Sequence, residues 1–410
     1  NAGTAFVVVD QHRMDDFRPY IFMTTNFGKT WQKIVSDLPA DDYVKVVRQD
    51  PHNPNLLFAG MEHGIYASWN MGKNWEKINV DLPNVSVRDL RIQARERDLI
   101  VGTHGRGAYI LDDIRPLEEM EEATGKDVHL FPVREGTLWN MFWRIENLGD
   151  RTYKAKNPEY GTYINFSLNN NAEEPVKVEI KDQNGQLVTT LVHKEAKKGI
   201  NRIIWDLGHE GAKALQNKVE EGFNYGGIRP QVAPGTYTAH LDYMGQSLTT
   251  EIQVSGDPRI EMSQTDYEAK VEALLNLRDL LSETHEFIDH VSLVIDQTAH
   301  LKEKLDSYNQ GDTSTVEALH KELSGFKDER LMRPPPSMNY RQRPRLREEI
   351  RSLMRAIDNT TNPPTIPQLR RIESLKAELI QHQKTMETME VQVKKINTSH
   401  SSIPQIILNP

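Results

Sequence analysis

Two copies of one short motif constrain what this chain can fold into. Residues 24–31 read TTNFGKTW and residues 68–75 read SWNMGKNW. In each copy a hydroxyl residue is followed by Asn two positions later, by Gly after two more and by Trp after three more. The closing tryptophans, Trp31 and Trp75, are 44 positions apart, a repeat length typical of a four-stranded β-propeller blade.

The residue types of the motif explain its shape. Asn in a tight turn can bond to its own backbone and tolerates left-handed geometry, and Gly readily adopts positive φ. We therefore expect Asn26 with Gly28, and Asn70 with Gly72, to form structural turns. The tryptophan that ends each copy is expected to pack between neighbouring sheets.

Short apolar segments around the motif predict the strands of the blades. Residues 44–49, 56–60, 64–68 and 75–78 supply four strands in order, and residues 87–94, 99–103 and 107–111 begin the next blade. Residues 4–10 and 20–24 are expected to be the second and third strands of a blade that lacks its first. Residues 1–115 are thus expected to be the last blades of a propeller. A closed propeller has about 4–8 blades, so we expect the others to come from an N-terminal part of the same protein, of which this chain is a fragment or a processed piece.

The remaining sequence predicts two further domains. Residues 116–158, with an acidic run and the tryptophans Trp139 and Trp143, are expected to be a linker. Residues 159–256 alternate like strands around the hairpin signal Asn184-Gly185, which predicts an immunoglobulin-like β-sandwich. Residues 257–400 are expected to form an antiparallel helical bundle, followed by a tail at 401–410. The heptad-like seam of its first helix consists of Leu274, Leu277, Leu281, Ile288, Val291 and Ile295. The predicted fold class is therefore multidomain, mainly β and then α.

The amino-acid composition argues against several classes of function for this chain. The chain has 410 residues and a net charge of −9, which argues against a nucleic-acid partner. It holds no apolar run of about 18 residues or more, so no membrane-spanning segment is expected. The lack of cysteine excludes disulfides, thiolate chemistry and cysteine-based zinc sites. We predict neither a cofactor nor a metal site.

The best candidate binding surface consists of the loops that join the second and third strands of successive blades. In a propeller these loops open on one face, and the turns of the repeated motif lie on the opposite face. Loops 11–18, 61–63 and 104–106 each carry a histidine and a charged residue. The candidate binding residues are His12, Arg13, Asp16, Arg18, Glu62, His63, His104 and Arg106.

Two interpretations of these loops stay open. In the functional one, the arginines bind carboxylate or phosphate groups, and the acidic residues and histidines act as acid–base or metal-binding groups. In the structural one, all are ordinary surface residues, and Arg106 pairs with Asp112 or Asp113 on its own hairpin. No catalytic residue is identified.

The repeated motif resembles the Asp boxes, or BNR repeats, of sialidase-like and sortilin-type propellers, with Asn26 and Asn70 in place of the usual Asp. The string VGTHGRGAYILDDI at 101–114 is similar to the last-blade segment of large bacterial proteins described as sortilin-like or glycosyl-hydrolase-like. Further similarity lies in GINR at 199–202, APGTY at 233–237 and DPR at 257–259. The resemblance covers nearly the whole chain. It implies secretion, to the extracellular space or often to a bacterial cell surface, with the periplasm as an alternative.

Two functions follow as hypotheses. The first is a secreted binding or scaffold protein whose propeller and adaptor domains engage a protein or glycan partner. The alternative is a sialidase-like, glycan-processing hydrolase whose catalytic residues lie mostly on the missing blades. The first is favoured because no spacing in the chain identifies the arginine cluster, Tyr–Glu pair and acid that a sialidase needs.

Overall fold

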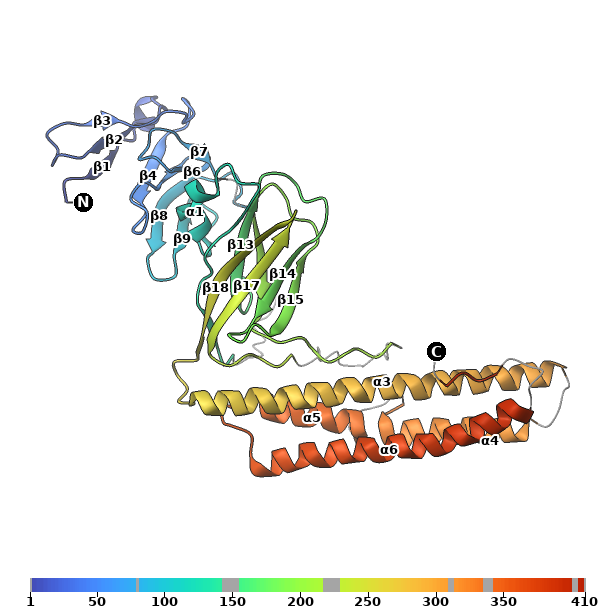
Figure 1. Ribbon diagram of the computed structural model, residues 1–410. Helices are drawn as coiled ribbons and strands as arrows, with labels where there is room; N and C mark the ends of the chain where they lie inside the picture. Colours follow the sequence, from blue (N-terminus) through green and yellow to red (C-terminus); the bar gives the residue numbers. More distant parts are fainter. Residues whose placement is uncertain are drawn as a thin grey trace. The chain divides into compact units, whose positions relative to one another are not determined.

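The computed structural model describes residues 2–78, 81–141, 155–216, 229–308, 313–334, 342–399 and 405–408. Antiparallel sheets are followed by a C-terminal helical region (Figure 1). The chain divides into two compact units. The first comprises Asn1–Gly136, Ile145–Asp206 and Thr236–Gln253, and the second comprises Thr137–Arg144, Leu207–Gly235 and Val254–Pro410.

Three antiparallel sheets at the N-terminus follow the order of the sequence. The first is β1-β2-β3, the second β4-β5-β6-β7 and the third β10-β9-β8. Their bounds are β1 Ala5–Val8, β2 Ile21–Thr24, β3 Gln32–Lys33, β4 Val44–Gln49, β5 Leu57–Met61, β6 Gly64–Ser68, β7 Glu76–Lys77, β8 Val87–Gln93, β9 Asp98–Thr103 and β10 Ala108–Leu111. A 3-10 turn, η1 (His12–Met14), lies between β1 and β2. Consecutive meanders of this kind fit a partial propeller.

The middle sheet is buried on both faces. One face of this sheet packs against Ile21 of β2 and against Ile34, which follows β3. The other face packs against Val87 and Leu90 of β8. Gly60 in β5 allows the third sheet to approach closely. A Cβ built there would lie 2.6 Å from Val87 Cγ1 and 2.7 Å from Val46 Cγ1, so no side chain fits without a shift.

The repeated motif forms two turns with matching hydrogen bonds. In the first, Thr24 Oγ1 accepts from the backbone N–H of Gly28 at 3.0 Å, and Asn26 Oδ1 accepts from the N–H of Thr30 at 3.0 Å. In the second, Ser68 Oγ accepts from Gly72 at 2.8 Å, and Asn70 Oδ1 accepts from Asn74 at 2.9 Å. The two residues that follow each Asn have positive φ: Phe27 (61°) and Gly28 (78°), and Met71 (60°) and Gly72 (82°).

The two tryptophans of the motif differ in burial. Trp75 is 3% exposed and its Nε1 donates to the carbonyl of Ile34 at 3.0 Å, so it packs between two sheets. Trp31 is 44% exposed, which differs from the expectation that both rings are buried. The reason is topological: the first sheet has a neighbouring sheet on one side only in the part of the chain that the structure describes.

The next strands form two antiparallel sheets, ordered β11-β13-β16 and β12-β18-β17-β14-β15. Their bounds are β11 Val128–Leu130, β12 Gly136–Leu138, β13 Thr162–Leu168, β14 Val176–Lys181, β15 Leu187–His193, β16 Gly199–Trp205, β17 Gly235–Tyr243 and β18 Gln246–Gly256. Phe166 and Trp205 are fully buried among their apolar side chains. The Asn184-Gly185 turn joins β14 to β15, with Gly185 at a φ of 78°.

The segment expected to be a linker at 116–158 contributes structure of its own. It holds β11 and β12 and the short helices α1 (Arg115–Glu118) and α2 (Met120–Ala123). Val128, Leu130 and Leu138 are buried, which explains why these short strands join the sheets. Trp139 is 44% exposed, and Trp143 lies outside the described residues. Part of the Gly-rich segment 208–233 also lies outside them.

The helical region contains α3 (Gln264–Tyr308), α4 (Ser314–Phe326), a π-helical turn η2 (Lys327–Leu331), α5 (Leu346–Asp358) and α6 (Ile366–Ser399). The long helices α3 and α6 run in the same direction, and α4 and α5 return between their ends (Figure 1). His290 of α3 contacts Glu390 of α6 at 3.1 Å, in agreement with this arrangement.

All six residues of the predicted seam in α3 are buried. In α6, Leu369 is 45% exposed. Of the predicted tail at 401–410, residues 405–408 are described, and Ile406 is buried against the helices.

Candidate functional site

Polar side chains from three successive sheets meet at one edge of the N-terminal sheets. Because neighbouring strands are antiparallel, the end of β1, the start of β4, the end of β5 and the start of β8 come to the same edge. We call the residues that contact one another there the rim cluster. The rim cluster consists of Asp10, His12, Tyr43, Lys45, Glu62 and Ser86.

One half of the rim cluster is centred on the carboxylate of Asp10. His12 Nδ1 lies 2.5 Å from Asp10 Oδ1, and Lys45 Nζ donates to Asp10 Oδ2 at 2.6 Å. The imidazole of His12 stacks on the ring of Tyr43, with the centroids 4.7 Å apart. Lys45 Nζ lies 4.2 Å from the centroid of the same ring. The first sheet is thus joined to the second by an ion pair and an aromatic stack.

The other half is centred on Glu62. Its Oε2 accepts from the hydroxyl of Tyr43 at 2.8 Å and from the hydroxyl of Ser86 at 2.6 Å. Tyr43 is therefore shared between the two halves, with its ring against His12 and its hydroxyl on Glu62. A continuous chain of contacts runs from the first sheet to the segment that enters the third.

The rim cluster holds its acidic groups in the ionised form. Burial alone would raise the pKa of Asp10, but the hydrogen bonds from Lys45 and His12 outweigh it and hold the pKa at about 2. Burial also opposes ionisation of Glu62, yet the hydroxyls of Ser86 and Tyr43 bring its pKa below the ordinary value. Burial and the bond to Glu62 raise the pKa of Tyr43 to about 12, so its phenol stays a donor.

A second histidine is anchored beside the rim cluster by a buried carboxylate. His63 Nδ1 lies 3.2 Å from Asp42 Oδ1, where the Asp42 side chain is 5% exposed and the His63 side chain 56% exposed. Burial raises the pKa of Asp42, although His63 acts in the opposite direction. The two side chains lie at ion-pair distance without hydrogen-bond geometry, since Asp42 Oδ1 has no hydrogen-bond partner among the described residues.

The other residues predicted from the loops are placed differently. Arg18 forms a two-pronged pair with Asp16 through Nε at 2.9 Å and Nη2 at 2.7 Å, and Tyr20 donates to the same carboxylate at 2.8 Å. Arg18 and Asp16 bond to each other and to Tyr20, and among the described residues this group makes no contact with the rim cluster. Arg13, His104 and Arg106 are exposed, and their side chains make no hydrogen bond or ion pair with any residue that the structure describes.

The loop of His104 is nevertheless tied to the same edge, because the backbone N–H of His104 donates to the carbonyl of Ser86 at 2.9 Å. The structure thus brings His12 and Glu62 into one cluster, with His63 and His104 on adjoining segments. Loop reasoning missed Asp10, Tyr43, Lys45 and Ser86, since they lie at strand ends. In a propeller, the segments that connect one blade to the next lie on the same face as the loops between second and third strands. Including these connecting segments in the search would have identified the four missed residues.

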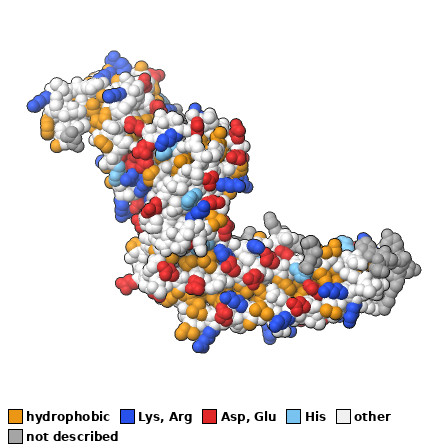
Figure 2. All heavy atoms as spheres, viewed as in Figure 1, with side chains coloured by type: hydrophobic (Ala, Val, Ile, Leu, Met, Phe, Trp, Pro, Cys, Tyr) orange, Lys and Arg blue, Asp and Glu red, His pale blue; other side chains and the backbone are white. Residues whose placement is uncertain are grey.

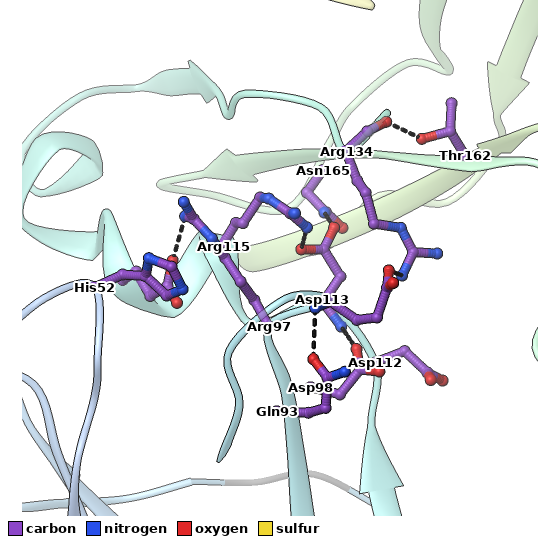
Figure 3. Close-up of polar contacts among 12 residues, drawn as sticks. His52, Gln93, Arg97, Asp98, Asp112, Asp113, Arg115, Arg134, Thr162 and Asn165 are labelled. Carbon is purple, nitrogen blue, oxygen red and sulfur yellow. Dashed lines mark hydrogen bonds and ion pairs between the residues drawn. The ribbon is translucent and has the colours of Figure 1, made fainter. Parts of the chain in front are cut away.

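A separate polar network fastens the third sheet to strands β13 and β16 (Figure 3). Asp113 accepts from Arg115 at 2.5 Å, and its backbone N–H donates to Asp98 at 2.9 Å. Arg202 donates to the carbonyl of Asp112 at 2.8 Å, and Asn165 Nδ2 lies 3.4 Å from Asp113 Oδ2. Asp113 is 2% exposed, so this network is a structural joint. Its carboxylate is occupied by Arg115, not by Arg106 as one interpretation of the sequence required.

On the face that Figure 2 shows, acidic and basic side chains are interspersed over both the sheets and the helices. Among the described residues, no helix combines the length and the apolar character needed to span a bilayer.

No family model matches this sequence, and no curated protein sequence is similar to it. The solved structures that are similar in part include the following three. The first, an ancestral GH74 enzyme, has a TM-score of 0.23 and 15% identity, over 62% of this chain and 34% of that chain. The extracellular domain of a one component system from B. thetaiotaomicron has a TM-score of 0.18 and 11% identity, over 57% of this chain and 28% of that chain. YCF48 bound to D1 peptide has a TM-score of 0.16 and 10% identity, over 57% of this chain and 61% of that chain.

The chain therefore spans about a third of the length of the first two structures. Overlaps at these TM-scores do not assign the chain to a family.

Proposed function

We propose that this chain is part of a secreted or cell-surface binding protein, with a sortilin-like, Asp-box type of propeller that engages a protein or glycan partner at the rim cluster. The observation that carries the proposal is the continuous contact chain from Asp10 to Ser86, contributed by three successive sheets. It fixes one edge as a rigid platform. Arg13, His104 and Arg106 are exposed on the loops of that edge, and their side chains have no hydrogen-bond or ion-pair partner among the described residues.

Binding is favoured over hydrolysis by the electrostatics of the rim cluster. A glycoside hydrolase needs one carboxylic acid with a raised pKa beside an ionised carboxylate. Asp10 and Glu62 both have lowered pKa values and both are engaged by internal donors. The raised pKa in this neighbourhood belongs to Asp42, whose side chain is buried against His63. A hydrolase whose catalytic groups lie on other blades is the alternative.

The remaining domain assignments belong to the same proposal. Residues 159–256 would be an immunoglobulin-like adaptor and 257–400 a helical adaptor. Further blades from an N-terminal part of the same protein would pair with β1. The exposed side chains of Val7 (42%) and Trp31 (44%) support this, because an additional blade would cover apolar surface there.

The test uses the full chain on an array of acidic oligosaccharides that carry sialic acid or uronic acid. Exposed arginines favour carboxylate ligands. Arg13→Ala and Arg106→Ala should each weaken binding about 10- to 100-fold, as expected for a lost hydrogen bond to a charged group. Arg95→Ala is the control, since Arg95 is also exposed, pairs with its neighbour Glu96, and lies in the turn between β8 and β9, at the opposite edge.

Three results would distinguish the possibilities. Loss of binding in the rim variants alone supports the proposal. Equal loss in all three variants contradicts a specific rim site and indicates attraction by overall charge. Release of sugar from the same oligosaccharides by the unmodified chain would contradict a binding role alone, because it would require catalytic groups on this chain.

A further inference from the structure

Three potential metal ligands converge where the α2 segment meets β11, outside the rim cluster. Glu119 directly precedes α2, Glu122 lies three positions later within α2, and His129 is in β11. One ligand atom from each side chain lies within 4.8 Å of the other two. Positions three apart share one face of a helical turn, which explains why both carboxylates point the same way. The pairing of His129 with Ser167 of β13 fixes the third ligand.

The imidazole of His129 is held in place but is incompletely satisfied. Its ring packs edge-on against Phe131, with the centroids 4.8 Å apart. Its Nε2 is buried and has no hydrogen-bond partner among the residues that the structure describes. A buried polar atom without a partner is destabilising, and the same imidazole has one ring nitrogen within 4.8 Å of a carboxylate oxygen of each glutamate.

The two carboxylates are only partly compensated, because Arg97 and Arg115 act on Glu119 from beyond ion-pair distance. Neither Glu119 nor Glu122 forms an ion pair with any described residue. The only cation in contact with the group is Lys126, whose Nζ lies 3.2 Å from His129 Nδ1 within the described part of the chain. Two anionic side chains this close repel each other unless a cation lies between them.

We propose that Glu119, Glu122 and His129 bind a divalent first-row metal ion, zinc or manganese. Two carboxylate oxygens and one imidazole nitrogen form a mixed oxygen–nitrogen donor set, and imidazole suits zinc better than it suits calcium or magnesium. Ligands at about 2.0–2.2 Å from one ion lie roughly 3–4 Å from each other, so small rotations of the glutamates complete the site. Three protein ligands leave positions for water. The ion would tie α2 to β11.

The test is calorimetric titration of the EDTA-treated full chain with zinc chloride and, separately, with manganese chloride. We expect one high-affinity ion for each chain. Loss of a supporting contact around a metal ligand typically weakens affinity about 10- to 100-fold, so removal of a ligand should cost at least tenfold. Glu119→Gln, Glu122→Gln and His129→Asn should each show this loss. Glu121→Gln is the matched control, because Glu121 is the exposed neighbour of Glu122 and lies outside the group.

A fifth variant, Lys126→Met, keeps the test decisive if His129→Asn does not fold. Lys126→Met removes the ammonium that repels an incoming cation, and should tighten binding. Weaker binding in Glu122→Gln together with tighter binding in Lys126→Met supports the site. Unchanged affinity in Glu122→Gln, or an equal loss in Glu121→Gln, overturns it. In addition, zinc should raise the melting temperature of the unmodified chain and not that of Glu119→Gln. None of these residues belongs to the rim cluster, so the result is independent of the proposed function.

Discussion

The imidazole of His12 lies nearly parallel to the ring of Tyr43, with the centroids 4.7 Å apart and 12° between the planes. The stack matters because the same tyrosine donates its hydroxyl to Glu62 at 2.8 Å. One side chain therefore joins the turn that follows β1 to the loop that follows β5. The rim cluster depends on Tyr43 more than on any of the residues predicted from the loops.

Tyr43→Phe tests this dependence, because it keeps the stack and removes the hydrogen bond to an ionised carboxylate. We expect unfolding free energy to fall by about 1.5–3 kcal/mol, the usual contribution of a hydrogen bond to a charged group. Chemical denaturation monitors the loss. Tyr20→Phe removes a similar bond to Asp16 away from the rim cluster, so it should reduce stability while leaving ligand binding intact. Equal loss of binding in both variants would contradict a special role for Tyr43.

Stability should depend on pH through Asp10. Its pKa in the folded chain is about 2, below the value of 3.8 for the free side chain. A carboxyl with a lowered folded pKa stabilises the fold above its unfolded pKa, and this contribution disappears as pH falls from about 4 to about 2. Because the side chain is 30% exposed and solvent screens the pair, we expect about 1 kcal/mol. Urea unfolding of the unmodified chain and of Asp10→Asn, between pH 5 and pH 2, measures the difference. Parallel curves for the two proteins would refute the assignment.

The two tryptophans of the repeated motif should differ in their contribution to stability. Trp75→Ala removes a ring that is 3% exposed and should destabilise by about 3–5 kcal/mol. Trp31→Ala removes a ring that is 44% exposed and should cost much less, about 1 kcal/mol. Thermal and chemical unfolding of both variants provide the comparison. A large loss in Trp31→Ala would mean that its ring is covered in solution.

Gly60→Ala should destabilise by about 1–3 kcal/mol, because the added methyl group would overlap Val46 and Val87 between two sheets. Gly102→Ala in β9 is the matched control. A Cβ at that position would meet its nearest neighbour at 3.6 Å, which is an ordinary contact. If the two variants unfold at the same denaturant concentration, the close approach of the second and third sheets is wrong.

Local chemistry explains the features of this fold that the sequence predicts. The repeated turns depend on Asn, Gly and hydroxyl residues within eight positions, so their geometry is readable without the rest of the chain. The apolar seam of α3 is equally local. In contrast, β11 and β12 are three residues each and carry too little pattern to separate them from a linker. They become strands because β13 and β18 offer them free edges.

The candidate sites depend on contacts that sequence spacing does not contain. His12 and Glu62 were among the predicted residues, but their link through Tyr43 requires two sheets to be packed. Glu119 and Glu122 share a helical turn that spacing could suggest. His129 joins them only through the pairing of β11 with β13, and no sequence motif predicts that pairing.

The position of β12 in its sheet has a consequence for synthesis on the ribosome. This strand is hydrogen-bonded to β18, and more than a hundred residues are translated between the two. At about 5–20 residues per second, the nascent chain waits roughly 5–20 s before β12 can find its partner. During that interval its backbone is open to chaperones and to other nascent chains. The five-stranded sheet can be completed only after β18 has left the exit tunnel, by which time all the strands of the N-terminal sheets have been made.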